Sequence, residues 1–112
     1  MNVTELIPAP VGRESFMRNR YRFVPDVAGC YALTTFTGTI LYVGLTNDLR
    51  RRMNEHLDSS EKTSETSEGR AIFFQWWQGE ELEKVERTWM NIHIQNEGRL
   101  PIMNGVYSPV SG

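Results

Sequence analysis

Two β-forming segments separated by a very short turn constrain the fold of this chain most strongly. The segments Cys30–Phe36 and Thr39–Gly44 are rich in β-branched and aromatic residues, and only Thr37 and Gly38 lie between them. A connection of this length is typical of an antiparallel β-hairpin. A third segment, Ala71–Trp77, carries large aromatic side chains on both faces. We expect it to complete the sheet as its central strand.

Two helices are expected to pack on this sheet. The polar residues 46–48 can supply an N-cap for the first helix, which runs to about Leu57 with an apolar residue every four positions from Leu49. Residues 80–98 form the second helix, which Gly98 ends. The element order predicts an α/β (α+β) sandwich with a small central three-stranded antiparallel sheet flanked by helices. The apolar stripe of the second helix consists of Leu82, Val85, Trp89 and Ile92.

The length of 112 residues is suited to one folded domain. We expect residues 1–28 to form an N-terminal arm with a basic lead-in, residues 29–105 the domain, and residues 106–112 a tail. Within the lead-in, Glu14–Phe23 fits either a short helix or an irregular segment. The polar and acidic segment Asp58–Gly69 has no periodicity, which predicts a loop.

Several features favour an intracellular protein without a membrane anchor. No apolar run reaches the ~18 residues expected of a membrane span, and the N-terminal residues lack the pattern of a signal peptide. The single cysteine, Cys30, cannot form a disulfide within the chain, which fits a reducing compartment.

The charge distribution leaves two alternatives open. The net charge is −2, but residues 1–57 carry seven arginines against five acids, whereas residues 58–112 carry five basic residues against nine acids. Arginine matches the geometry of phosphate groups well. The N-terminal half therefore forms either a basic face for nucleic acid or an ordinary solvated surface. The arginines expected to contact a DNA backbone are Arg18, Arg20, Arg50 and Arg51.

Four polar side chains are expected to converge at the hairpin. Arg52 and His56 lie four positions apart, so they project from the same face of the first helix. The paired strands bring Tyr31 and Tyr42 close together. Tyrosine or histidine can accept a proton from water, and arginine can neutralise a phosphorane-like transition state. Cys30 with His56 would be an alternative, thiol-based centre, although a small buried residue is the simpler interpretation of Cys30.

The paired motif of this hairpin resembles that of the GIY-YIG nuclease family. "GCY" at Gly29–Tyr31 is followed after ten residues by "YVG" at Tyr42–Gly44. The resemblance covers roughly residues 29–105, as expected of a compact single-domain member. Further positions that match the family pattern are Arg52, His56, Glu86 in "KVERTWM" and Asn104 in "PIMNG".

The resemblance implies a metal-dependent DNA endonuclease. It assigns catalytic roles to six residues. Tyr31 is the general base or water-positioning group with Tyr42 beside it, and either His56 or the network of metal-bound water accepts its proton. Arg52 is the phosphate clamp, Glu86 the ligand of one Mg²⁺ or Mn²⁺ ion, and Asn104 a brace. The expected partner is DNA, with a homodimer or a separate targeting protein as further possibilities. The alternative is a member of the same fold that binds nucleic acid or protein without cutting.

Overall fold

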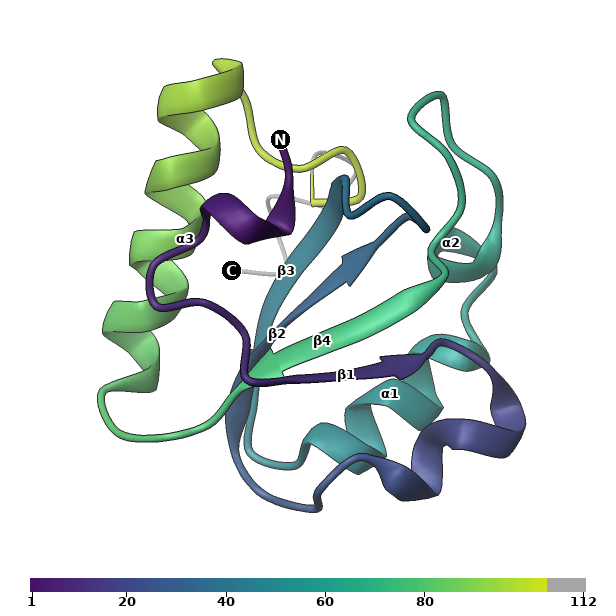
Figure 1. The fold of residues 1–112 in the computed structure, drawn as a ribbon. Coiled ribbons are helices and arrows are strands. Elements are labelled where there is room, and N and C mark those ends of the chain that lie inside the picture. The colour runs from purple at the N-terminus through teal and green to yellow at the C-terminus, as the bar shows by residue number, and fades with distance from the viewer. Residues whose placement is uncertain (105–112) are drawn as a thin grey trace, which may run out of the picture.

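A computed structural model describes residues 1–104, and the expected tail and the end of the predicted domain lie outside these described residues. The chain forms a four-stranded antiparallel sheet in the order β1-β4-β2-β3 (Figure 1). The predicted α+β architecture and the antiparallel hairpin are confirmed, but the predicted number of three strands is wrong. The strands are β1 (Gly12–Ser15), β2 (Gly29–Thr34), β3 (Ile40–Thr46) and β4 (Phe73–Trp77).

The additional strand β1 comes from the segment that was expected to be an arm. Its sequence, GRES, contains no β-branched or aromatic residue, so composition gives no strand signal. The strand forms because its backbone pairs with the free edge of β4. A Cβ atom at Gly12 would lie 2.2 Å from the Trp76 ring, so glycine allows this close approach. The Arg13 guanidinium then lies over the Phe73 ring.

Helices cover both faces of the sheet (Figure 1). α1 (Leu49–Leu57) begins at Asp48, whose side chain accepts a hydrogen bond from the backbone N–H of Arg51. α3 (Leu82–Glu97) ends at Gly98, which adopts a positive φ of 76°. Among residues 1–104, no helix is both long and apolar enough to cross a membrane.

Three shorter helical segments refine the expectations for the connecting regions. η1 (Val3–Glu5) and η2 (Arg18–Phe23) are 3-10 helices, so Glu14–Phe23 is partly strand and partly helical turn. α2 (Ser60–Thr63) lies within the segment that was predicted to be a loop. That prediction is wrong at α2, because a single short turn has no periodicity that a sequence can reveal.

The alternating residues of β2 divide the core into two layers. Tyr31 and Leu33 face α1 and pack with Leu49 and Met53. Their neighbours on β2 face α3, where the core includes Trp89. Each helix therefore covers one face of the sheet, and α3 packs mainly on the edge strand β3.

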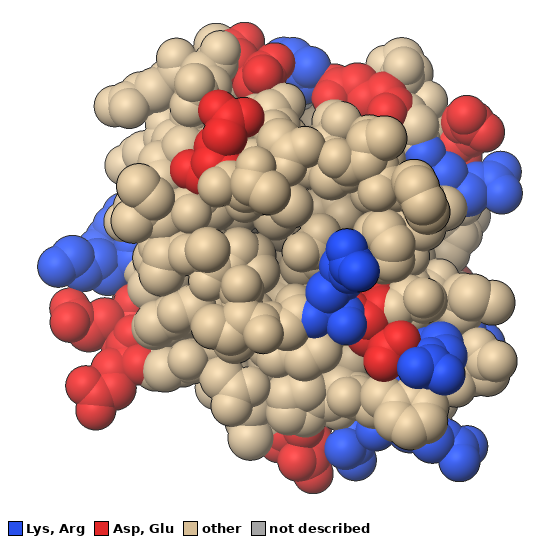
Figure 2. Space-filling model, viewed as in Figure 1, with Lys and Arg blue, Asp and Glu red and all other residues tan. Residues whose placement is uncertain are grey.

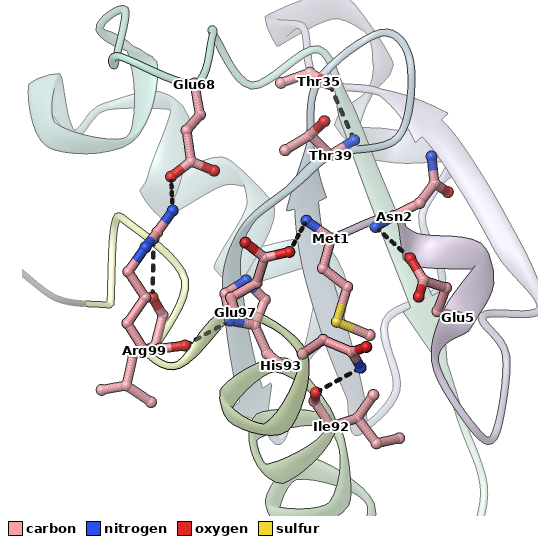
Figure 3. Close-up of polar contacts among 12 residues, drawn as sticks. Met1, Asn2, Glu5, Thr35, Thr39, Glu68, Ile92, His93, Glu97 and Arg99 are labelled. Atoms are coloured by element: carbon pink, nitrogen blue, oxygen red, sulfur yellow. Dashed lines mark hydrogen bonds and ion pairs between the residues drawn. The ribbon is translucent and has the colours of Figure 1, made fainter.

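The C-terminal half of α3 differs from the predicted stripe at one position. Ile92 is only partly buried, whereas His93 is 1% exposed. His93 Nδ1 lies 2.7 Å from the carbonyl oxygen of Arg99, and Glu97 pairs with the N-terminal amine at 3.1 Å (Figure 3). A polar residue thus occupies the core position because the chain beyond the helix returns to meet it.

Candidate active site

Tyr31 lies at the centre of the candidate site, on the α1 face of β2. Its side chain is 1% exposed, and its ring stacks on Phe74 with centroids 4.9 Å apart. Its hydroxyl oxygen lies 2.7 Å from Nε2 of His56. This contact joins the hairpin to the last turn of α1 and satisfies two polar groups in a buried region.

The hairpin register explains why glycine follows Tyr42 and Val43. Tyr31 is paired directly with Gly44 across the two strands. A Cβ atom at position 44 would lie 2.5 Å from the Tyr31 hydroxyl. The tyrosine hydroxyl therefore occupies the space that a side chain at position 44 would fill, and Gly44 is needed for the position of Tyr31.

Tyr42 completes an aromatic cluster with Tyr31 and His56. The Tyr42 ring centroid lies 6.0 Å from that of Tyr31 and 5.4 Å from that of His56. The three rings come from β2, β3 and α1. The sequence expectation that the two tyrosines and the histidine meet is in agreement with this geometry.

Burial controls the protonation of this cluster. Burial, together with the nearby positive charges of Lys62 and Arg52, lowers the pKa of His56 to about 3. Burial, followed by the neighbouring Tyr42, raises the pKa of Tyr31 well above its ordinary value. At neutral pH, His56 is therefore a neutral imidazole and Tyr31 carries its proton.

Arg52 lies one helical turn before His56 and is only partly exposed, at 38%. Its Nη1 pairs with Glu55 at 3.2 Å. Its Nε atom is the one buried side-chain nitrogen or oxygen without a hydrogen-bond partner within residues 1–104. A buried N–H donor of this kind is costly unless a ligand satisfies it. Arg52 can therefore accept an anionic ligand beside the tyrosines.

Asn104 braces the strand that carries Tyr42. Its Oδ1 accepts a hydrogen bond from the backbone N–H of Val43 at 2.9 Å, and its Nδ2 donates to the Val43 carbonyl oxygen at 3.0 Å. The side chain thus mimics a neighbouring strand at the open edge of β3 and satisfies both backbone groups between Tyr42 and Gly44.

Glu86 is a partly buried carboxylate on α3, whereas Glu80, Glu81 and Glu83 are exposed. Burial raises the pKa of Glu86, and the charge of Glu83 adds to this effect. The charge of Glu86 also raises the pKa of Tyr31, but it is the weakest of the causes, and α3 covers the face of the sheet opposite to that of Tyr31.

The residues present allow one carboxylate ligand for a metal ion. No cluster of three or more His, Cys, Asp or Glu side chains suited to a metal occurs in residues 1–104. Glu86, however, forms no ion pair with a described residue. A carboxylate with an energetic cost of burial and no cationic partner fits a hard divalent cation that keeps water and takes phosphate as further ligands.

The thiol-based alternative is not in agreement with the geometry. Cys30 is fully buried on the α3 face of the sheet, opposite the face that contains His56. Its Sγ lies 3.1 Å from the carbonyl oxygen of Leu82, and burial raises its pKa to about 12. Since a thiolate is the reactive form, Cys30 is an inert core residue.

A groove of about 910 Å³ runs over the end of β3, between the starts of α1 and α3. Arg51 and Arg52 line one wall, and Glu83 and Arg87 line the other. Over the face viewed in Figure 2, acidic and basic side chains are interspersed. The groove therefore places arginine side chains next to the site, although the surface around them is not basic as a whole.

The four arginines expected at the DNA backbone all have partners within the protein. Arg20 pairs with Glu14 at 2.9 Å, and Arg50 Nε donates to the Val24 carbonyl oxygen at 2.8 Å. Arg18 contacts Asn54 and Asp58, and Arg51 contacts Asn47 and Glu55. Of the four, Arg51 lines the groove. Their role in binding DNA stays a prediction.

The chain matches the model of a known protein family. The family model described as the GIY-YIG catalytic domain matches residues 27–97, which is most of the chain. The protein belongs to the GIY-YIG family, whose domains have a nuclease-type fold, are generally endonucleases and typically use divalent metals. A search of curated proteins found no match.

Structure adds two site features that sequence reasoning missed. Lys62, from the expected loop, lies with its Nζ atom 4.7 Å from the centroid of the Tyr42 ring. Glu55 pairs with both Arg51 and Arg52. The i, i+3 and i, i+4 spacing of Glu55 was available as a signal, whereas the approach of Lys62 depends on the fold of residues 58–69.

Proposed function

We propose that this protein is a metal-dependent DNA endonuclease that hydrolyses one phosphodiester bond per active site. The observation that carries the proposal is the buried hydrogen bond between Tyr31 and His56, with the unsatisfied Arg52 Nε close by. A structural core would not be expected to combine a neutral histidine, a tyrosine hydroxyl and an arginine whose donor lacks a partner.

Tyr31 and His56 would act as a proton relay. A tyrosine that holds its own proton can accept one from water only if it passes its proton on. In the tautomer with the proton on Nδ1, Nε2 of His56 accepts that proton. The charge of a bound phosphate would favour the imidazolium that forms, because an opposite charge nearby raises a histidine pKa.

Arg52 would hold the scissile phosphate. The transition state carries more negative charge on the phosphoryl oxygens than the ground state does, so a fixed guanidinium donor stabilises it selectively. The ion pair with Glu55 keeps Arg52 ordered before DNA binds. Tyr42 positions the relay, and Asn104 keeps β3 in place through its contacts with Val43.

Glu86 would hold one Mg²⁺ or Mn²⁺ ion. When bound, such an ion polarises the phosphate and stabilises the leaving oxygen. In this proposal Glu86 provides a carboxylate oxygen from α3, and the support for its role is its partial burial without an ion pair. Burial and the charge of Glu83 raise the pKa of Glu86, so a bound cation would offset an unfavourable negative charge.

Nicking of supercoiled plasmid DNA tests the proposal. We expect the purified protein to convert supercoiled into open-circular plasmid in Mg²⁺ or Mn²⁺, and EDTA to stop the reaction. A matched preparation of Glu86→Gln controls for contaminating nuclease. If the protein binds plasmid but never nicks it with either ion, it is a non-cleaving member of the family.

A further inference from the structure

Lys62 brings a positive charge to the site from the segment between α1 and β4. It lies in α2, which packs beside the end of α1 (Figure 1). The side chain is partly buried, and its ammonium lies over the Tyr42 ring at 4.7 Å from the centroid. The cation therefore faces the tyrosine cluster, although the segment that carries it is acidic overall.

This ammonium has no carboxylate partner within residues 1–104, where the other lysine pairs with a glutamate. Asp58, in the same segment, pairs with Arg18 instead, and Glu65 pairs with Arg70. The adjacent Glu61 is exposed and forms no ion pair with Lys62. A partly buried lysine without an ion-pair partner is available for an external anion.

Lys62 and Arg52 approach His56 from two different helices. Both positive charges act on the same imidazole, and Lys62 has the larger effect of the two on its pKa. In the free protein, the two cations near the buried histidine disfavour a third positive charge, namely that of protonated His56. An anion bound between them would relieve this repulsion, and a phosphodiester carries one negative charge in its ground state and more in its transition state.

We propose that Lys62 is a second phosphate-binding residue of the site, whose ammonium contacts a phosphate of the cleaved DNA strand beside Tyr42. This inference rests on the proposed endonuclease function. It assigns a substrate contact to α2, within a segment that charge alone would place away from DNA. A compact ammonium with three donors can follow the phosphate as its charge grows.

Two variants separate this role from packing. Lys62→Met keeps an unbranched side chain over the Tyr42 ring but removes the charge. Lys62→Arg keeps the charge and can also stack on the ring. Arg70→Met is the matched control, because it removes one positive charge from the same segment at a residue that is exposed and paired with Glu65. Thermal unfolding establishes that each variant is folded.

The measurements are the salt dependence of DNA binding in EDTA and the single-turnover nicking rate at saturating DNA. Loss of one phosphate contact should reduce the slope of log K against log salt by about 0.9 for duplex DNA. We expect Lys62→Met to show this reduction and a nicking rate lower by about 10- to 100-fold, as for removal of one charge-assisted hydrogen bond. Lys62→Arg should restore both, and Arg70→Met should change neither.

The possible failures are distinguishable. An unchanged salt slope in Lys62→Met overturns the inference even if nicking slows, because Lys62 would then act only through Tyr42. An equal effect in Arg70→Met also overturns it, since net charge would be the cause. Wild-type protein that binds DNA without nicking it contradicts the endonuclease function, while the binding slopes still decide the role of Lys62. Wild-type protein that does not bind DNA contradicts both.

Discussion

The hydroxyl of Tyr31 on β2 and Nε2 of His56 on α1 lie 2.7 Å apart, although the two residues are 25 positions apart in the chain. Burial acts on the two groups in opposite directions, so that the tyrosine keeps its proton and the histidine stays neutral. This pairing brings a proton donor and a proton acceptor into contact at neutral pH.

Tyr31→Phe should remove the relay without removing the fold. The phenylalanine ring can still stack on Phe74, but the buried Nε2 of His56 loses its partner, which should cost about 1–3 kcal/mol of stability. Nicking should fall by at least ~10²-fold under single-turnover conditions, as for loss of a positioned general base. Tyr21→Phe is the control, since Tyr21 is a partly buried tyrosine of η2. Wild-type nicking in Tyr31→Phe would shift the base role to Tyr42 or His56.

Arg52→Ala and Arg51→Ala should separate catalysis from binding, because the two arginines are neighbours on α1 and both pair with Glu55. Arg52→Ala should lower the nicking rate at saturating DNA by about 10²–10³-fold, as for removal of one transition-state donor. Arg51→Ala should weaken binding similarly on unrelated duplexes and reduce its salt dependence, because backbone contacts carry no sequence information. Equal nicking rates for both variants at saturation would exclude a special role for Arg52.

The sequence predicts the hairpin and the meeting of its tyrosines with Arg52 and His56, because these depend on short-range rules. A two-residue turn sets the strand pairing, and the i, i+4 spacing sets the helix face. The same reasoning predicts that Glu86, next to Val85, borders the buried stripe, and its partial burial confirms this position. Its role as a metal ligand stays a prediction.

The features that the sequence does not predict depend on long-range contacts. β1 is a strand because the edge of β4 is available to it, and its own residues favour no particular structure. His93 is buried because the chain returns at Arg99 to accept its hydrogen bond. Lys62 lies over the Tyr42 ring because of the turn of α2, and the acidic segment contains no sequence pattern that predicts this turn.

Stability should fall as the pH is lowered through the range in which only the unfolded His56 gains a proton. Its folded pKa of about 3 lies below the ordinary value of 6.5, so the unfolded state binds more protons between these values and the native state is favoured at higher pH. The contribution lost between pH 6.5 and pH 5 should be about 2 kcal/mol. Urea denaturation of the wild type and of His56→Gln should diverge over this range. Parallel curves would show that His56 is not buried as a neutral group.

Gly44→Ala should damage the site through a steric clash. The new methyl group would lie 2.5 Å from the Tyr31 hydroxyl, which forces Tyr31 away from His56 or separates β2 from β3. We expect a loss of about 1–3 kcal/mol of stability from overpacking, together with loss of nicking. Gly98→Ala is the control, because a Cβ there meets nothing within 4 Å and only the positive φ of 76° is strained. Gly98→Ala should lower the melting temperature slightly and leave the nicking rate of the folded protein unchanged.

Glu86→Gln should separate metal-dependent cutting from folding and binding. Glutamine has nearly the same shape but provides no negative charge, so cutting in Mg²⁺ or Mn²⁺ should be lost. DNA binding should be unchanged or tighter, because a negative charge near the phosphate is removed. The pKa of Glu86 is higher in the folded than in the unfolded protein, so its ionised carboxylate destabilises the folded state at neutral pH. Glu86→Gln should therefore unfold at a slightly higher temperature than the wild type.

Glu83→Gln is the matched control on the same helix, since Glu83 is exposed and also lines the groove. It should retain metal-dependent cutting, and the loss of its charge should lower the pKa of Glu86 slightly. Isothermal titration with Mn²⁺ alone provides a second readout, in which Glu86→Gln should lose binding heat that Glu83→Gln retains. If Glu83→Gln is inactive and Glu86→Gln cuts normally, the metal ligand lies on the exposed face of α3, and the partly buried carboxylate has no catalytic role.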